Sequence, residues 1–369
     1  MGGASILFGG TLDESARRDI EEKRAPRIDV LLLQDALQAD VYDFRRLELA
    51  SRTERRASFA YRQARRTGQW SAWLSFYAFP YIRNNDVVYA TGEDVGFAVA
   101  ALMRLYRARR PRLLVRLEEP NYGRTMTRRT IFNLYAQYAL ERVDRILCRT
   151  TAHLQYLNSV CKQPIRKLTF LPQTCDVQFY NDSLVDKRVP SDVSKDEPYI
   201  LSAGLEMRDY PTLIQAGQDL PINVVIAAGS PWSKDLFGGG NNELPSNMSV
   251  SKFSPVHMRE VYQSANFVVV PVRPTLRACG MNVVLEAWSL GKAVIATRTL
   301  GLLDYISDGE NGLLVEPYDV QGMRGAIERL LRDPDEANRL GTNGRNVVTR
   351  KFALDDYIQW VQQIISSGL

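Results

Sequence analysis

The segment from Cys279 to Thr297 constrains the fold of this chain more than any other stretch, and it reads CGMNVVLEAWSLGKAVIAT. The pattern predicts a glycine turn, a helix, a second glycine turn at Gly291 and a short apolar strand. Strands of this uniformly apolar kind are typical of parallel sheets whose two faces are both covered by helices. The segment therefore indicates an α/β fold.

The start of the predicted helix is a candidate anion site. Gly280 can adopt backbone angles that other residues avoid, and the N–H groups of Met281, Asn282 and Val283 then open a helix, where a phosphate is stabilised. Glu286 follows after more than one turn, and its carboxylate can accept hydrogen bonds from sugar hydroxyls. The expected ligand is a nucleoside diphosphate. The alternative is an ordinary βαβ fragment with no ligand.

These residues resemble the C-terminal domain of the retaining GT-B glycosyltransferases, the glycosyl transferases group 1 family. The resemblance covers about residues 195–355 and includes the turn Asn311-Gly312 before the apolar LLV. It implies an α/β GT-B fold, with two Rossmann-like α/β domains facing a cleft. It also implies a nucleotide-diphosphate sugar as co-substrate, transfer with retention, no further cofactor and no metal.

The length of 369 residues suits two domains. We expect an N-terminal acceptor-side Rossmann-like domain over residues 1–180 and a polar linker over 181–197. The nucleotide-sugar-binding domain follows over 198–352, and a C-terminal helix over 353–369 is expected to cross back to the first domain, as is common in the family. In the first domain, apolar runs predict strands at Ser5–Phe8, Ile28–Leu33 and Ala39–Asp43.

Two parts of the N-terminal domain are assigned to the site by the resemblance. Gly9 and Gly10 follow the first strand, and in resembling enzymes this loop faces the donor; the alternative is a plain turn. The strand Arg112–Leu117 ends at Glu118 and Glu119, where many resembling enzymes carry a histidine that this chain lacks. Either glutamate is a candidate catalytic residue that orients a sugar hydroxyl or accepts the proton of the acceptor.

The donor side keeps part of the family pattern. In the loop after Tyr199–Ala203, Arg208 takes the place of the family's lysine, while Leu205 stands where an arginine is expected. Phe253 follows a predicted strand and is expected against the nucleotide base. Arg208 is assigned to the donor diphosphate, because a guanidinium can bind phosphate through two hydrogen bonds.

The family's Glu-x7-Glu pattern is incomplete, because Ala278 stands where the first glutamate is expected. Glu286 retains the ribose contact, and the contact to the donor sugar is lost. We assign a replacement contact to Arg277, with Arg273 as a second candidate. Two functions follow from the resemblance: a glycosyltransferase, or a catalytically silent GT-B scaffold or partner subunit.

Charge is distributed unevenly along the chain. Residues 51–150 contain 19 arginines, no lysine and 8 acidic residues, whereas the whole chain has a net charge of +5. A basic helix in residues 52–66 runs into an aromatic-rich segment over 70–81, a combination that suits an anionic membrane surface. The alternative is that the rings are core and the arginines a solvated face.

The remaining expectations concern partners and location. The acceptor is expected to be a sugar, a lipid-linked molecule or a phosphate-bearing molecule, and nucleic acid is excluded because no recognised motif accompanies the charge. The chain has no run of 18 apolar residues and no signal-peptide pattern at its start. Its four cysteines lack metal-site spacing. We expect a cytoplasmic protein, peripheral on the inner face of the membrane.

Overall fold

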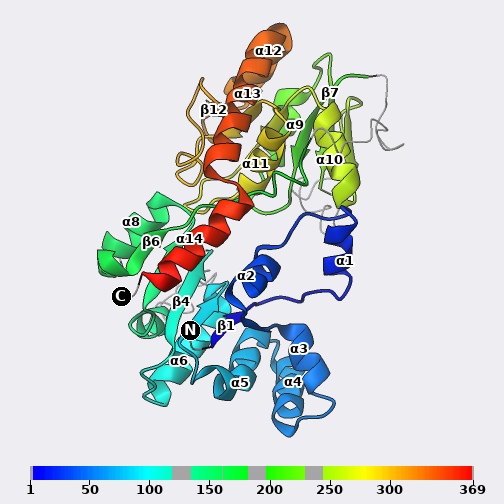
Figure 1. Cartoon of the computed structure of the whole chain (residues 1–369). Helices are drawn as coiled ribbons and strands as arrows, with labels where there is room; N and C mark the ends of the chain where they lie inside the picture. Colours follow the sequence, from blue (N-terminus) through cyan, green and yellow to red (C-terminus); the bar gives the residue numbers. More distant parts are fainter. Residues whose placement is uncertain (1–2, 119–133, 160, 182–196, 229–243, 368–369) are drawn as a thin grey trace. The chain divides into compact units, whose positions relative to one another are not determined.

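The computed structural model describes residues 3–118, 134–159, 161–181, 197–228 and 244–367 (Figure 1). The chain forms two compact units. Unit 1 comprises Met1–Arg18, Ile28–Leu171 and Ile358–Leu369, and unit 2 comprises Asp19–Arg27 and Pro172–Tyr357. Two helices are divided between the units, α1 (Ala16–Glu21) and α14 (Leu354–Ser366). The chain therefore passes between the units at more than one point.

Unit 1 is built on a parallel sheet of six strands in the order β2-β1-β3-β4-β5-β6. The strands are β1 (Ala4–Leu7), β2 (Asp40–Tyr42), β3 (Val87–Ala90), β4 (Arg112–Leu117), β5 (Arg145–Cys148) and β6 (Leu168–Phe170). The strand order reverses between β1 and β3, and open α/β sheets bind ligands at the carboxyl ends of the strands beside such a reversal. The loops after β1 and β3 are therefore the places to search for a site.

Three helices of unit 1, α3, α4 and α5, pack on one another, and α5 also packs on α6 and β1. The described helices are α2 (Asp29–Leu37), α3 (Phe44–Ala50), α4 (Arg55–Thr67), α5 (Trp70–Ile82), α6 (Glu93–Leu105), α8 (Thr151–Ser159), the 3₁₀ turn η1 (Ile165–Lys167) and a helical stretch over 134–140.

The prediction of a strand at Ile28–Leu33 is wrong, because these residues open helix α2. A short apolar run does not distinguish a strand from a buried helix. Here Val30 and Leu33 lie one turn apart and are both buried, and Gln38 ends the helix in the left-handed conformation. The strand that pairs with β1 on this side is β2, within the run predicted at Ala39–Asp43.

Unit 2 is built on a second parallel six-stranded sheet, in the order β12-β11-β10-β7-β8-β9. The strands are β7 (Tyr199–Ala203), β8 (Asn223–Ala227), β9 (Met248–Ser251), β10 (Val268–Val270), β11 (Val294–Thr297) and β12 (Leu313–Val315), and the helices are α9 (Tyr210–Gly217), α10 (Pro255–Ser264), α11 (Met281–Ser289), α12 (Val320–Arg332) and α13 (Pro334–Lys351). This order reverses between β7 and β10 and is that of a doubly wound Rossmann fold.

The core of unit 2 follows the two-residue period of its strands. In β7, Leu201 and Ala203 belong to the apolar cluster on one face of the sheet, and Ile200 belongs to the cluster on the other face. In β10, Val268 and Val270 lie on the first face and Val269 on the second. Strands buried on both faces need apolar residues at every position, which explains the uniformly apolar run that the sequence shows.

Candidate functional site

The loop that follows β7 holds a buried arginine. Arg208 is 6% exposed, and it donates hydrogen bonds from Nε to the carbonyl of Ala203 (2.8 Å) and from Nη1 to that of Glu206 (2.9 Å). Burial lowers the pKa of its guanidinium. Among the described residues no carboxylate forms an ion pair with it. These two hydrogen bonds of the guanidinium thus go to carbonyl oxygens and not to a carboxylate, an arrangement that favours an added anion.

This loop is fixed to the loop that follows β10, the strand on the other side of the reversal. Arg208 and Val272 form an isolated antiparallel bridge. The N–H of Asp209 donates to the carbonyl of Pro271 (3.0 Å), and the N–H of Arg273 donates to that of Met207 (2.9 Å). The backbone at the reversal is thus held by main-chain hydrogen bonds on both sides of Arg208.

Gly280 places the start of α11 beside this arginine. Its φ is +87°, and a Cβ there would lie 2.7 Å from Cγ1 of Val270 and 3.7 Å from Nη1 of Arg208. Only glycine satisfies both the backbone angle and the space. The N–H of Met281 donates to Ala278 (3.2 Å), whereas those of Asn282 and Val283 have no acceptor among the described residues. Two N–H groups at the helix start are therefore available to an anion.

The side chains that follow Gly280 differ in exposure. Met281 is 1% exposed and packs in the core, so its side chain lies away from solvent, whereas Asn282 is exposed. Any contribution of Met281 to ligand binding is consequently through its backbone. Ala278, which replaces the family's glutamate, packs against the same core.

Glu286 lies on the second turn of α11 and is partly buried. Its Oε2 accepts a hydrogen bond from the hydroxyl of Tyr262 (2.8 Å), and Tyr180 donates a second. Burial raises the pKa of Glu286 to about 7, although both tyrosines and the charge of Arg208 act in the opposite direction. The tyrosine rings pack edge to face with centroids 6.3 Å apart and fix both hydroxyls. The carboxylate is therefore held in one orientation.

Arg277 lies in the loop before α11 and forms an ion pair with Glu206. The Glu206 side chain is 66% exposed and that of Arg277 is 26% exposed. Glu206 thus contacts both arginines of the site, Arg208 through its backbone carbonyl and Arg277 through its side chain. Leu205, at the family's arginine position, is exposed.

Phe253 follows strand β9 by two residues and is half-buried against the core of unit 2. It precedes helix α10, which begins at Pro255 and is capped by the Ser254 hydroxyl accepting from the N–H of His257 (3.3 Å). The same helix carries Tyr262, the partner of Glu286. A single helix therefore follows Phe253 and supports the candidate ribose contact.

In unit 1, the two glycines after β1 pack closely on their neighbours. A Cβ on Gly9 would lie 2.6 Å from Oδ2 of Asp94 in the first turn of α6, and one on Gly10 would lie 2.7 Å from the ring of Phe8. The carbonyl of Gly10 accepts the N–H of Phe44 (2.9 Å). The loop therefore reaches α6, the helix that follows the strand on the other side of the reversal.

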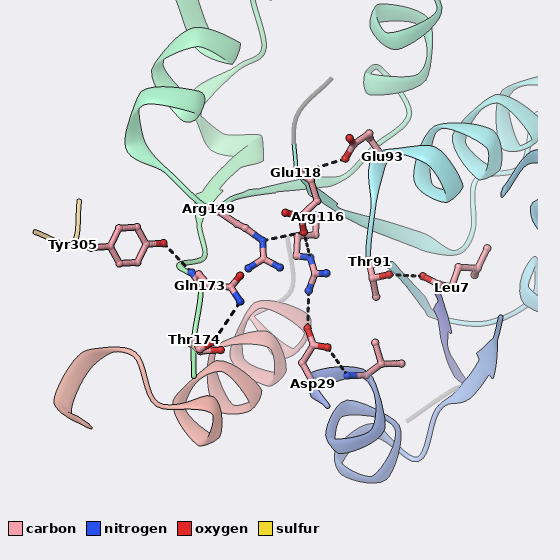
Figure 2. A network of polar contacts seen from close by, with 11 residues as sticks. Leu7, Asp29, Thr91, Glu93, Arg116, Glu118, Arg149, Gln173, Thr174 and Tyr305 are labelled. Atoms are coloured by element: carbon pink, nitrogen blue, oxygen red, sulfur yellow. Dashed lines mark hydrogen bonds and ion pairs between the residues drawn. The ribbon is translucent and has the colours of Figure 1, made fainter. Parts of the chain in front are cut away.

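The carboxyl ends of β4 and β5 carry a network of charges (Figure 2). Oε1 of Glu118 lies 3.0 Å from Nε of Arg116 and 2.9 Å from Nε of Arg149, and Nη1 of Arg116 lies 2.7 Å from Oδ2 of Asp29 at the start of α2. The N–H of Glu118 donates to Oε2 of Glu93 (2.9 Å). Burial would raise the pKa of Asp29, but the charges of Arg116 and Arg149 outweigh it and lower that pKa. Oε1 of Glu118 therefore lies within ion-pair distance of two arginines.

Several candidates lie outside the described residues. Glu119 is one of them, as are the arginines of the loop that follows it and most of the predicted linker. Within the described parts of the chain, no group of three or more His, Cys, Asp or Glu side chains is placed to hold a metal ion. In the same parts, no helix has both the length and the apolar character needed to cross a bilayer.

The sequence analysis missed four residues: two in the charge network of unit 1 and two that surround Glu286 in unit 2. Arg149 directly follows β5, and a polar residue at the carboxyl end of a buried strand is a signal that could have found it. Tyr180 follows Phe179 in a segment that the sequence analysis did not assign to the site. Tyr262 and Asp29 carry no local signal, because their roles depend on contacts with Glu286 and Arg116, which lie far away in the sequence.

Comparison with known proteins identifies the donor-side unit. Residues 186–347 match the family described as Glycosyl transferases group 1. Unit 2 is a Glycosyl transferases group 1 domain. Among solved structures, HepE of Anabaena in complex with UDP-glucose is similar over all of both chains, with a TM-score of 0.69 and 13% sequence identity. This likeness concerns the fold, and it makes the two parallel sheets a GT-B pair.

Curated relatives of the group 1 domain include bacterial transferases. The lipopolysaccharide core biosynthesis glycosyltransferase LpsE of Rhizobium meliloti is 28% identical over 185 residues, which are 49% of this chain and 53% of LpsE. The D-inositol 3-phosphate glycosyltransferase of Corynebacterium urealyticum is 33% identical over 132 residues, 34% of this chain and 30% of that protein. The chain thus matches about half or less of the length of these relatives.

Proposed function

We propose that this protein is a retaining, metal-independent glycosyltransferase that moves a sugar from a nucleoside diphosphate sugar to an acceptor. The observation that carries the proposal is Arg208, a buried guanidinium without a carboxylate partner among the described residues, next to the glycine that opens α11. Membership of unit 2 in the group 1 family supports it. The acceptor class remains a sugar, a lipid-linked molecule or a phosphate-bearing molecule.

The donor diphosphate is assigned to the positive end of α11. Arg208 and the N–H groups of Asn282 and Val283 bind its oxygens, and Arg277 adds a second guanidinium once it leaves Glu206. In the transfer, the bond between the anomeric carbon and the β-phosphate oxygen breaks, the acceptor hydroxyl oxygen bonds to the same carbon and gives its proton to a base, and the negative charge of the leaving diphosphate grows. Donors fixed before the reaction stabilise this charge more effectively than solvent does.

The nucleoside is assigned to the part of unit 2 that contains Glu286 and Phe253. Glu286, oriented by Tyr262 and Tyr180, accepts hydrogen bonds from the ribose hydroxyls. Phe253 is assigned to the base. Gly9 and Gly10, which allow close approach of the β1 loop, are assigned to the donor from unit 1.

For Glu118 we propose orientation of an acceptor hydroxyl. Its carboxylate lies directly after β4, at the carboxyl edge of the sheet, where Oε1 contacts both Arg116 and Arg149. Glu119 stays the alternative candidate for proton acceptance. The two glutamates are separated by comparing Glu118→Gln with Glu119→Gln, because loss of a base lowers kcat at saturating donor, whereas loss of an orienting group raises the KM for the acceptor.

A catalytically silent GT-B protein is the second candidate, and Ala278 and Leu205 favour it. The two are distinguished by calorimetric titration with uridine, guanosine and adenosine diphosphates, followed by release of nucleoside diphosphate from the matching sugar nucleotides. We expect binding of one nucleotide and slow release that an acceptor accelerates. Binding without release for every sugar tested, or no binding of any nucleotide, would refute the transferase and support the silent protein.

A further inference from the structure

Helix α4 carries arginines that have no partner among the described residues. The helix contains five arginines and no acidic residue. Arg56 is used internally, since its guanidinium lies 4.0 Å from the centre of the Phe76 ring and donates to the Phe76 carbonyl. The others form no ion pair or hydrogen bond with any described residue, and they are Arg55, Arg62, Arg65 and Arg66.

The arginines of unit 2 provide a contrast. On α12 and α13 each of the exposed Arg329, Arg332 and Arg339 lies within ion-pair distance of a glutamate, either Glu328 or Glu336. These three exposed arginines of unit 2 are therefore neutralised by glutamates of the same chain, whereas four of the five arginines of α4 have no such partner among the described residues.

An aromatic ring lies within the arginine row. Arg55, Phe59, Arg62 and Arg66 follow at steps of four, three and four residues, so they share one face of the helix. All four are exposed, and the opposite face buries Ala57, Ala60 and Ala64. Phe59 itself is 42% exposed. We define this row as the α4 face.

The ring of Phe59 packs against two rings of helix α5. Its ring contacts those of Trp73 and Phe76 edge to face, with centroids 5.7 and 6.2 Å away, and the latter two rings lie 5.6 Å apart. α4 packs against α3 and α5, which places it on the outside of this helical layer of unit 1 (Figure 1). In α5, Tyr77 and Phe79 are buried, and Trp73 and Phe76 pack partly buried against the same core, whereas Phe59 stays at the surface among arginines.

We propose that the α4 face is the surface by which this protein attaches to an anionic lipid bilayer. Charge complementarity selects an anionic partner, since the arginines carry positive charge that no described residue offsets. The exposed ring selects a bilayer over a soluble polyanion, because an aromatic side chain gains from transfer to the headgroup boundary. The inference does not depend on transferase activity.

The test measures co-flotation of the full chain with vesicles. The vesicles contain phosphatidylcholine alone, or phosphatidylcholine and phosphatidylglycerol in equal parts. We expect binding to the second kind only, reduced by added salt. The variant with Arg55, Arg62 and Arg66 all changed to Gln is expected to bind roughly 100-fold more weakly, because each basic residue near such a surface contributes comparably.

The matched control changes Arg329, Arg332 and Arg339 to Gln, which alters the net charge equally and affects exposed arginines of unit 2. It is expected to bind anionic vesicles as the unchanged protein does. Equal weakening of both variants would overturn the proposal, because net charge alone would then explain binding. Circular dichroism of each variant verifies that the fold is retained.

Two further experiments distinguish a lipid bilayer from a soluble polyanion as the partner of the α4 face. Phe59→Ser is expected to weaken binding in high salt, where the apolar contribution dominates, and unchanged binding there would overturn the bilayer assignment. A single-stranded oligonucleotide and dextran sulfate are offered in place of vesicles. Tighter binding to either polyanion, with the same dependence on the α4 arginines, would show that the face binds a soluble polyanion instead.

Discussion

The two sheets of this protein have the same number of parallel strands, but the side chains at their carboxyl edges differ in how charge is balanced. In unit 1, Arg116 and Arg149 are matched by Asp29 and Glu118. In unit 2, Arg208 makes its hydrogen bonds to carbonyls, and Glu286 accepts from tyrosine hydroxyls. The ion pairs of the unit 1 edge stabilise the fold, whereas the charge of Arg208 at the unit 2 edge has no ion pair among the described residues and favours an added anion.

The largest effect is expected where the charges are balanced. Arg116→Met removes a buried guanidinium and leaves Asp29 without its closest partner, so we expect a loss of about 3 kcal/mol in the free energy of unfolding. Urea unfolding at neutral pH measures it. Arg110→Met is the control in the same unit, because Arg110 is 77% exposed and lies 3.6 Å from Asp86. Coincident urea midpoints for the two variants would show that the unit 1 network contributes nothing.

In unit 2, a substitution at Glu286 is expected to affect mainly nucleotide binding. Glu286→Ala removes the proposed ribose contact, and we expect a loss of about 2 kcal/mol in nucleotide affinity, or about 30-fold in Kd. Calorimetry is performed with the nucleoside diphosphate that binds and with its 2′,3′-dideoxy analogue. The unchanged protein should prefer the natural nucleotide, and the variant should not distinguish them. If the variant retains the preference, Glu286 does not contact the ribose.

Glu286 also makes unit 2 sensitive to pH. Burial raises its pKa from 4.5 to about 7, so between these values the folded state binds a proton that the unfolded state releases. The resulting stability is fully present below pH 4.5 and is lost as pH rises through about 7. Nucleotide affinity should change in the opposite direction, because ribose hydroxyls donate best to the ionised carboxylate, and we expect a several-fold gain across this transition.

The measurement for this prediction combines urea unfolding and nucleotide titration at matched pH values from about 5.5 to 8.5. Glu286→Gln keeps the size of the side chain and removes the titration, so both pH dependences attributed to Glu286 should disappear in it. A pH profile that is the same in the variant and the unchanged protein would assign the dependence to other groups.

The sequence predicts local features of the site, but it does not predict which charged side chains pair with one another. The helix start at Gly280 and the position of Glu286 on that helix could be predicted because backbone angle and helix spacing are local properties. The pairing of Glu118 with Arg149, and of Glu286 with Tyr262, joins elements distant in the chain and appears only in the folded structure. The error at Ile28–Leu33 has the same origin, because burial and not the apolar run decides between strand and helix.

The smallest effect concerns Glu206, a described carboxylate that forms an ion pair with a donor-side arginine. Glu206 pairs with Arg277 but is 66% exposed, and exposed pairs contribute at most about 1 kcal/mol. If Arg277 binds the donor diphosphate, Glu206 competes with it, and Glu206→Gln should tighten nucleoside diphosphate binding about two- to fivefold. Nucleoside monophosphate should gain less, since the competition concerns the outer phosphate.

The control for this change is Glu316→Gln, because Glu316 is 65% exposed and also pairs with an arginine, Arg298, in the same unit. It alters net charge identically and should leave Kd unchanged. Arg277→Ala completes the cycle: in that background Glu206→Gln should have no effect. A gain that persists without Arg277 would mean that Glu206 acts by general repulsion of the nucleotide, and unit 2 would then rely on Arg208 and the start of α11 alone to balance the diphosphate.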